Sequence, residues 1–422
     1  MLALLLGIAV LNYADRYLLS GLVSPIKAEF GLSDGTMGLL MGPAFAVLYT
    51  TVAIPIARLA DRTSRIAVVT AGCATWSLFT ALTAYAESGW MLAVARIGVG
   101  IGEAAYQAPA AALIAAYFPP QQRGRALAVV GTAIYFGQIL GMAGGPAIAA
   151  EYDWRAAFLA IGSVGILMAA TAFVIIREPP RSNVAAASGQ DRTALGALTR
   201  SIAAAPSMRM MTFGMALGTL SGVTFGLWGP ALFERAYGLS NAASGSAFVL
   251  AFGLPGFFGV LLFGLVADRL SRKGVSRALV LSAVALCAAT GLIAIVTWAP
   301  ELWIAQSLAV PSGLLGGGWS IGILAGFQHV LPERDRATGI ALALLIIGLF
   351  GNVIGPSAAG GMSDWFAAAD PAQGLRLGLS LIIPTGFLGA WCIYRASRTL
   401  EADRQRLAAQ AAGGVGEPGS PM

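Results

Sequence analysis

The sequence predicts an all-α polytopic membrane protein, with twelve transmembrane helices arranged in two six-helix bundles. Three observations predict this fold class. Hydrophobic residues make up 57% of the chain, charged residues make up 11% and the mean hydropathy is +0.76, whereas about a quarter of a soluble domain is charged. At about 35 residues per helix and loop, the 422 residues allow about 12 spans. Finally, motifs of the first half of the chain recur in the second half.

Charged or Pro/Gly-rich breaks divide the chain into twelve apolar stretches of membrane-spanning length. The opening stretch lacks a basic leader and a cleavage site, and its apolar run continues past Arg16, so we expect a first membrane helix and not a signal peptide. The first set of predicted helices covers 1–28, 35–58, 66–86, 89–116, 124–149 and 155–177. The second set covers 210–235, 242–266, 275–298, 302–330, 336–361 and 374–396.

These helices group into a domain plan with four parts. Residues 1–177 form the N-terminal six-helix bundle and residues 209–398 form the C-terminal one. Residues 178–208 between them hold prolines, serines and several charges, which predicts a cytoplasmic linker that cannot pack a core. Residues 399–422 form a cytoplasmic tail, whose Ala/Gly/Pro/Ser-rich end after Arg404 we expect to be disordered.

Two motifs repeat at one spacing. Phe30-Gly-Leu-Ser-Asp34 recurs as Tyr237-Gly-Leu-Ser-Asn241, and Ala60-Asp-Arg-Thr-Ser-Arg65 recurs as Ala267-Asp-Arg-Leu-Ser-Arg272, both 207 positions later (240 − 33 and 268 − 61). The pair Pro119 and Arg123 recurs 213 positions later, so one short insertion separates two halves of common ancestry. An even number of helices in each half makes the repeats parallel.

The basic residues indicate the orientation in the membrane. About 20 of the 26 Lys and Arg residues fall in alternate loops, which predicts that those loops, the linker and the C-terminus are cytoplasmic. This placement explains the net charge of +6 better than nucleic-acid binding does.

Cys73, Cys287 and Cys392 lie singly in apolar helices, so we expect neither disulfides nor a metal site. With no constellation for catalysis or a cofactor, we expect no enzyme.

Four ionisable residues lie deep inside apolar runs: Asp15, Arg16, Arg96 and Glu103. Each unpaired charge at the centre of a membrane helix costs about 2.5–3.5 kcal/mol, so four would cost on the order of 10–14 kcal/mol. We therefore expect them to be paired. Arg96 and Glu103 are two helical turns apart and lie on one face of one helix.

These four residues are candidates for proton coupling. Burial and a neighbouring arginine act in opposite directions on the proton affinity of a carboxylate, which allows it to bind and release protons. Asp15 and Glu103 are the proton-coupling candidates, and Arg16 and Arg96 are their charge partners. The alternative is a static network of buried ion pairs.

The second half lacks these charges, since glycine, alanine and valine occupy the matching positions. Its aromatic residues predict an apolar wall suited to a hydrocarbon tail. The substrate cavity is predicted to be lined by Tyr13, Tyr49, Tyr106, Gln107, Tyr135 and Gln138 from the first half and by Phe225, Trp228, Trp319 and Asn352 from the second.

The two Asp-Arg loops are predicted to lock the bundles together in one conformation. The residues concerned are Asp61, Arg62, Arg65, Asp268, Arg269 and Arg272. The alternative is that these charges only fix which side of the membrane the loops occupy.

The loops resemble the Gly-x-Leu-Ala-Asp-Arg-x-Gly-Arg motif of the major facilitator superfamily, although Ala57 replaces the leading glycine of the first copy. Ser64 and Ser271 replace the second glycine. The resemblance implies the major facilitator fold.

Within that superfamily, the first half is similar to the Spinster family of lipid transporters. The similarity rests on Asn12-Tyr-x-Asp-Arg16, Ile26-Lys-x-Glu-Phe30, Trp76-Ser77, Arg96-Ile-Gly-Val-Gly-Ile-Gly-Glu-Ala104, Pro109 and Phe118-Pro119. It implies a transporter that alternates access and moves sphingosine-1-phosphate- or lysophospholipid-like amphiphiles, often with protons. Short loops and Ala/Gly-rich usage suggest a bacterial member, which we expect in the inner membrane. We also expect a monomer whose partners are an amphipathic substrate, protons and membrane lipids. An organic-anion or drug transporter and a non-transporting lipid sensor stay open as alternatives.

Overall fold

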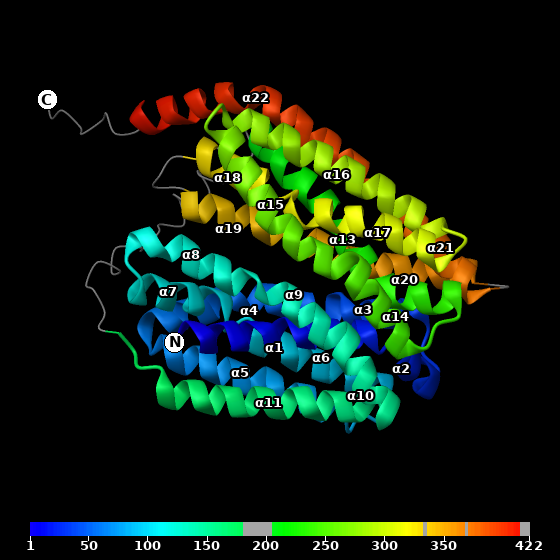
Figure 1. Ribbon diagram of the computed structural model, residues 1–422. Helices are drawn as coiled ribbons and strands as arrows, with labels where there is room; N and C mark the ends of the chain where they lie inside the picture. Colours follow the sequence, from blue (N-terminus) through cyan, green and yellow to red (C-terminus); the bar gives the residue numbers. More distant parts are fainter. Residues whose placement is uncertain (180–204, 332–335, 368–369, 414–422) are drawn as a thin grey trace, which may run out of the picture.

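The structure is a computed structural model that describes residues 1–179, 205–331, 336–367 and 370–413. In Figure 1 the helices of the first half, drawn from blue to cyan-green, lie in the lower part, and those of the second half, from green to red, lie in the upper part. Every regular element among the described residues is a helix. The predicted all-α fold class is confirmed.

The helices of the first half follow one another through short turns. They are α1 (Leu2–Gly21), α2 (Val23–Phe30), α3 (Asp34–Met41), α4 (Pro43–Arg62), α5 (Arg65–Thr83), α6 (Gly89–Glu103), α7 (Gln107–Tyr117), α8 (Pro120–Gly131), α9 (Ala133–Gln138), η1 (Ile139–Gly144), α10 (Gly145–Glu151) and α11 (Trp154–Ile175).

The second half repeats this plan. Its helices are α13 (Pro206–Tyr237), α14 (Asn241–Phe248), η3 (Val249–Gly253), α15 (Leu254–Ser271), α16 (Val275–Trp298), α17 (Leu302–Gly318), α18 (Ile321–Val330), α19 (Arg336–Gly348), η4 (Leu349–Ile354), α20 (Gly355–Phe366), α21 (Pro371–Ile382) and α22 (Thr385–Gly413). The last helix extends beyond the predicted end at 396, because Leu400 and Leu407 are buried and hold it against the bundle. The tail is therefore helical as far as Gly413, contrary to the expected disorder after Arg404. Most of the predicted linker and the last nine residues lie outside the described residues.

Eleven helical stretches among the described residues are long and apolar enough to cross a membrane. The predicted twelfth, at 89–116, is interrupted: α6 ends at Glu103 and α7 begins at Gln107. Pro109 has no N–H to donate to the carbonyl of Ala105, so a continuous helix would lose a backbone hydrogen bond at this point. The break lies directly beside Glu103, one of the predicted coupling residues.

The first repeated motif joins two helices in each half. Gly31 and Gly238 end their helices in the left-handed conformation, with φ of 60° and 63°. Ser33 and Ser240 then start the next helices, since their side chains accept hydrogen bonds from the N–H groups of Thr36 and Ala243. The sequence repeat is thus a repeat of helix-stop and helix-start signals.

Local π-helical turns also repeat. η1 and η4 occupy equivalent places in the two halves, and a Gly-Pro pair follows each of them. A third π-helical turn, η3, lies against η1. The proline removes a backbone donor, which favours such a bulge. The helices that face the other half are therefore interrupted near their middles.

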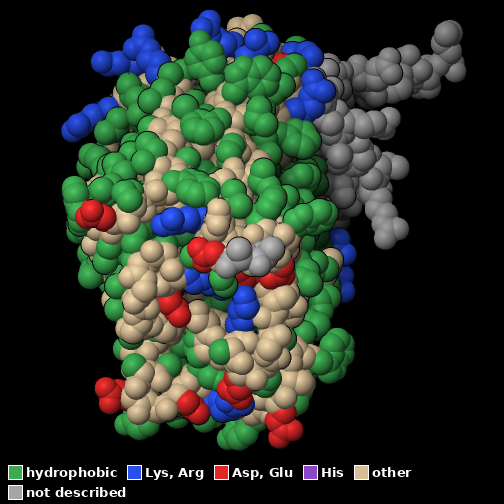
Figure 2. All heavy atoms as spheres, turned by 90° about the vertical axis from the view of Figure 1, so that its right-hand side faces the viewer, with side chains coloured by type: hydrophobic (Ala, Val, Ile, Leu, Met, Phe, Trp, Pro, Cys, Tyr) green, Lys and Arg blue, Asp and Glu red, His purple; other side chains and the backbone are tan. Residues whose placement is uncertain are grey.

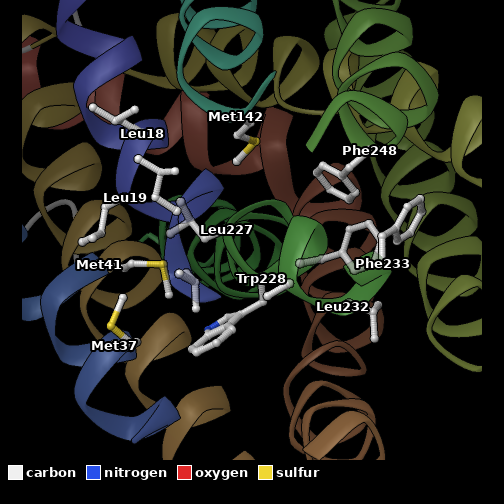
Figure 3. Close-up of a cluster of buried hydrophobic side chains, with 14 of the residues drawn as sticks. Leu18, Leu19, Met37, Met41, Met142, Leu227, Trp228, Leu232, Phe233 and Phe248 are labelled. Atoms are coloured by element: carbon white, nitrogen blue, oxygen red, sulfur yellow. The ribbon is translucent and has the colours of Figure 1, made fainter. Parts of the chain in front are cut away.

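The halves share one hydrophobic core at one end of the molecule only. We call this the Asp34 end, and the opposite end, where α11 ends and α13 begins, the linker end. Figure 3 shows side chains of both halves packed together in this core, namely Leu18, Leu19, Met37, Met41 and Met142 with Leu227, Trp228, Leu232, Phe233 and Phe248. Toward the linker end, each half packs mainly around a core of its own.

Candidate functional site

The four buried charges form two ion pairs between α1 and α6. Arg16 Nε donates to Glu103 Oε2 at 2.6 Å. Arg96 Nη1 lies 3.6 Å from Asp15 Oδ1 and donates to the backbone carbonyl of Asp15 at 3.4 Å. Asp15, Arg96 and Glu103 are each at most 2% exposed. The Arg16 side chain is 22% exposed. Each pair therefore joins one helix to the other and neutralises charges that are largely removed from water.

Aromatic rings surround Arg16. Its guanidinium carbon lies 4.7 Å from the ring centre of Phe45, 4.8 Å from that of Tyr49 and 5.3 Å from that of Tyr13. Arg96 also faces Phe45, at 5.5 Å. Such contacts stabilise a desolvated cation by about 2 kcal/mol. The aromatic residues hold the charge of Arg16 in place beside Glu103.

The charged cluster keeps hydrogen-bonding capacity that it does not use. Thr80 of α5 donates to Asp15 Oδ2. Several other polar atoms here are buried without a hydrogen-bond partner among the described residues: Asn12 Nδ2, Asp15 Oδ1, Arg16 Nη2, Arg96 Nε and Glu103 Oε1. Buried polar atoms are nearly always hydrogen-bonded in structural scaffolds. Their concentration here is typical of a functional site.

A cavity of about 420 Å³ lies between the two halves. Tyr17, Tyr135 and Gln138 line it from the first half, and Trp319 and a row of glycines line it from the second. None of the described residues that line it is charged. The glycines include Gly218, Gly222, Gly226, Gly253, Gly256, Gly313, Gly316 and Gly317. The cavity can therefore hold an apolar group, with a few polar contacts to orient it.

Helix α1 connects the charged cluster with the cavity. Asp15 and Arg16 belong to the cluster, whereas the next residue, Tyr17, lines the cavity. Further along, Ser20 donates to the carbonyl of Leu227 in the other half. A change in the ion pairs can thus reach both the cavity and the contact between the halves through one helix.

The Asp34 end is closed by polar contacts between the halves. Asp34 accepts hydrogen bonds from Arg235 at 2.6 and 2.8 Å and from the hydroxyl of Ser363 at 2.7 Å. In return, the side chain of Asp364 accepts the backbone N–H groups of Asp34 and Gly35 at 2.8 and 2.7 Å, which caps the start of α3. We call these five residues the seal. Figure 2 views the molecule from this end and shows acidic and basic side chains gathered near its centre.

Close backbone packing surrounds the seal. A Cβ atom on Gly38 would lie 2.4 Å from the carbonyl oxygen of Pro356, and one on Gly245 would lie 1.9 Å from that of Met142. Only glycine permits these approaches between the halves. Asn241, the repeat counterpart of Asp34, donates to the carbonyl of Gly21 at 2.9 Å. Both copies of the repeated motif thus contact the opposite half.

The chain matches a known protein family over most of its length. The family model described as Major Facilitator Superfamily matches residues 5–356. The chain belongs to the major facilitator superfamily. It is 33% identical to an MFS-type efflux pump of Mycolicibacterium smegmatis, over 94% of this chain and 92% of the pump. It is 30% identical to protein spinster homolog 1 of Mus musculus, over 94% of this chain and 80% of the homologue.

A crystal structure of a bacterial homologue of the human lysosomal transporter Spinster, in an inward-facing and unoccupied conformation, has the same fold. It superposes with a TM-score of 0.85 at 25% identity, over 96% of this chain and 97% of that one. The resemblance to Spinster proteins predicted from the N-terminal motifs is confirmed, as is the assignment to transporters and not to enzymes.

The two Asp-Arg loops of this major facilitator lie at the linker end. Asp61, Asp268, Arg269 and Arg272 are exposed, and no ion pair joins these four to another described residue. Glu178 instead binds the first loop, since it accepts hydrogen bonds from Ser64 at 2.9 Å and from the N–H groups of Arg65 and Ile66 at 3.2 and 3.0 Å. Partial burial raises the pKa of Glu178, but these donors outweigh it and hold the pKa below its usual range.

Three of the predicted cavity residues line the cavity, namely Tyr135, Gln138 and Trp319. Tyr13 and Tyr49 contact Arg16 instead, and Gln107 is exposed. Buried Tyr106 donates to the carbonyl of Leu5, and Asn352 donates to that of Gly348. Phe225 and Trp228 are fully buried in the core that the halves share. An aromatic residue in an apolar helix does not by itself indicate which face it occupies.

Several functional residues were not predicted from the sequence. Tyr17 of the cavity follows directly after Asp15 and Arg16, and that proximity was the available signal. Arg235, Ser363 and Asp364 of the seal lie at helix ends, where charged residues are common, so no signal set them apart. Thr80 is one of several threonines in α5 and carried no signal either.

Proposed function

We propose that this major facilitator is a proton-coupled secondary transporter that moves an amphipathic, lipid-like substrate by alternating access. The observation that carries the proposal is the uncharged cavity between the halves, with two buried ion pairs beside it in one half only. An apolar cavity suits the substrate, and a separate charged cluster suits the driving ion.

The seal supports alternating access. The halves share a core and polar contacts at the Asp34 end, and the exposed Asp-Arg loops lie at the other end. We infer that the structure represents the inward-facing state, which is also the state of the similar bacterial crystal structure. The linker and the C-terminus are then cytoplasmic, the Asp-Arg loops lock the opposite state, and residues 1–177 and 209–398 rock as two bundles.

Coupling is assigned to Asp15 and Glu103. Each carboxylate pairs with an arginine across α1 and α6, so protonation removes one charge and leaves its arginine unpaired. A ligand shifts a conformational equilibrium only by its different affinity for the two states. We infer that the cluster binds protons more tightly in one facing than in the other, and that α1 transmits the difference to the cavity.

The cavity favours an amphiphile over a small organic anion. An anion would need Arg16 or Arg96 as a direct ligand, but both are paired with carboxylates and lie against aromatic rings outside the cavity lining. A hydrocarbon tail fits the glycine-lined wall, and Tyr135, Gln138 and Trp319 can contact a polar group. The similarity to an efflux pump keeps a hydrophobic drug as a second candidate substrate.

Quenching of tryptophan fluorescence in the purified protein tests the substrate class. A lysophospholipid, a cationic amphiphilic dye and a short carboxylate are titrated separately into the wild type and Trp319→Phe. The proposal expects quenching by the lysophospholipid that is lost in the variant. Quenching by the dye alone would indicate a drug transporter, quenching by the carboxylate alone would contradict the proposal, and lipid binding without uptake into liposomes would indicate a sensor.

A further inference from the structure

Thr80 lies between a carboxylate and a backbone carbonyl. Its side chain is fully buried in α5. The hydroxyl lies within hydrogen-bonding distance of Asp15 Oδ2 and also of the carbonyl oxygen of Trp76, at 2.9 Å. A hydroxyl carries a single hydrogen, so it donates to only one of these acceptors at a time, while its oxygen can accept a further hydrogen bond.

We propose that Thr80 is a positioning residue that serves both protonation states of Asp15. When Asp15 is ionised, the Thr80 hydroxyl donates to Oδ2. When Oδ2 takes up a proton, its O–H donates to the oxygen of Thr80, whose own hydrogen turns to the carbonyl of Trp76. The proton comes from water and forms the O–H bond on Oδ2, which is the only covalent bond that changes on the protein. The hydrogen bond from Thr80 to Oδ2 is replaced by one from Oδ2 to Thr80 and one from Thr80 to Trp76, and no heavy atom needs to move. The inference rests on the proposed proton coupling and assigns the oxygen that carries the proton.

The surroundings of Asp15 favour Oδ2 as that oxygen. Oδ1 faces Arg96 Nη1 at 3.6 Å, and a guanidinium has no acceptor for the hydrogen of a protonated carboxyl. Thr80 does have one. The other ionisable groups close to Asp15 are Arg16 on its own helix, Glu103 on α6 and the thiol of Cys73 on α5. None of these three is a hydrogen-bond partner of Oδ2.

The neighbouring threonines of α5 provide a matched control. Thr83 is buried as deeply as Thr80, and its hydroxyl donates at 2.9 Å to the carbonyl of Phe79, four residues earlier, just as Thr80 does to that of Trp76. Thr70 and Thr75 bond the same way. Among these four threonines, however, the described hydrogen bonds join only Thr80 to a carboxylate. A general effect on the helix should therefore be shared by Thr83→Val, whereas an effect on Asp15 should not.

Infrared difference spectra of the purified full-length protein, recorded during a pH titration, test the inference. The C=O stretching band of protonated Asp15 is identified by its loss in Asp15→Asn. Thr80→Val keeps the shape but removes donor and acceptor, so we expect the band at a higher wavenumber, because the carboxyl hydrogen has lost its acceptor. Thr80→Ser and Thr83→Val should leave the band unchanged. Proton movement into liposomes should fall at least tenfold in Thr80→Val and stay at the wild-type level in Thr80→Ser and Thr83→Val.

The outcomes separate this inference from the proposed function. An unchanged Asp15 band in Thr80→Val, or a shift as large in Thr80→Ser, would overturn the role of Thr80 whatever transport shows. A band that behaves as expected in a protein that moves no protons would refute the coupling and leave the role of Thr80 standing. The absence of any Asp15 band in the wild type would overturn the role of Thr80 and leave Glu103 as the residue assigned to coupling. Thermal melting of each variant establishes that it folds.

Discussion

Asp34 of α3 and Arg235 of α13, which are 201 positions apart, form a two-pronged ion pair that joins the two halves. The guanidinium nitrogens lie 2.6 and 2.8 Å from the two carboxylate oxygens, and Asp34 is 1% exposed. Parallel hydrogen bonds of this kind fix geometry as well as charge. Because both bonds must break when the halves separate, this pair stabilises the closed Asp34 end.

Arg235→Ala should therefore open the Asp34 end. The variant loses two hydrogen bonds between charged groups across the halves, each worth about 1.5–3 kcal/mol, while Lys27 of the first half keeps Asp34 paired. A difference of 1.4 kcal/mol is a factor of ten in an equilibrium. We expect the ratio of open to closed molecules to rise at least tenfold. Electron-resonance distances between spin labels at Tyr152→Cys and Trp303→Cys, both exposed at this end, measure that ratio in a chain without its native cysteines.

The matched control is Arg155→Ala. Arg155 lies at the same end and forms an ion pair with Glu29 at 2.6 Å, but both residues belong to the first half. Its hydrogen bonds hold the pKa of Glu29 below the usual range, so the pair is formed at neutral pH. Opening by Arg155→Ala as large as that by Arg235→Ala would show that the seal does not hold the halves together.

The seal shows where prediction from the sequence stops. The repeat identified Asp34 and Asn241 as equivalent, because both follow the same helix-stop glycine. It could not identify Arg235 as the partner, since that depends on how two separate bundles dock. The buried charges behaved differently: their desolvation cost alone required partners, and the structure supplies them, crosswise between α1 and α6.

Gly222→Leu should block transport without destabilising the protein. Gly222 lines the cavity, and a Cβ atom there meets nothing within 4 Å, so the new side chain extends into the space that the substrate would occupy. Replacing glycine within a helix is favourable by about 0.5–1 kcal/mol. We expect uptake into liposomes to fall at least tenfold, with an unchanged or higher melting temperature.

Gly124→Leu serves as the control for this variant. Gly124 lies exposed on α8, also with open space around its Cβ position and outside the cavity lining. Equal losses in both variants, or full uptake by Gly222→Leu, would mean that the substrate does not use this cavity. The sequence does not distinguish these glycines from those at close contacts, and the structure shows which of them face open space.

Glu178→Gln should remove an acid-sensitive contribution to stability. The carboxylate lies at the start of α5, where an anionic cap contributes about 1 kcal/mol. Because the pKa of Glu178 is lowered in the folded protein, this contribution is complete above the pKa of an unfolded glutamate, about 4.3, and is lost as the pH falls through the lower folded pKa. The melting temperatures of wild type and variant should differ at pH 7 and converge toward acid pH. A melting-temperature difference that stays constant with pH would contradict the role of Glu178 as a cap of α5. So would a difference equal to that caused by Glu151→Gln, which changes an exposed glutamate.

The π-helical turns mark another limit of prediction. A helix of the predicted length can accommodate Pro146 or Pro356 by a kink, a break or a bulge, and the sequence does not decide among them. The structure has a bulge before each Gly-Pro pair, at 145–146 and 355–356, and both prolines lie where the halves approach each other, beside Gly245 and Gly38. Contacts made by folding, and not local preference, decide among these outcomes.

Proton movement in liposomes measures most directly whether the Asp15–Glu103 cluster couples transport. Purified protein is reconstituted with a pH-sensitive dye inside, and a lysophospholipid is added to the wild type, Asp15→Asn and Glu103→Gln. We expect lipid-dependent proton movement in the wild type that is lost in at least one of the two variants, while lipid binding persists. Proton-driven uptake that stays intact in both variants would show that the two ion pairs are static and that coupling lies elsewhere.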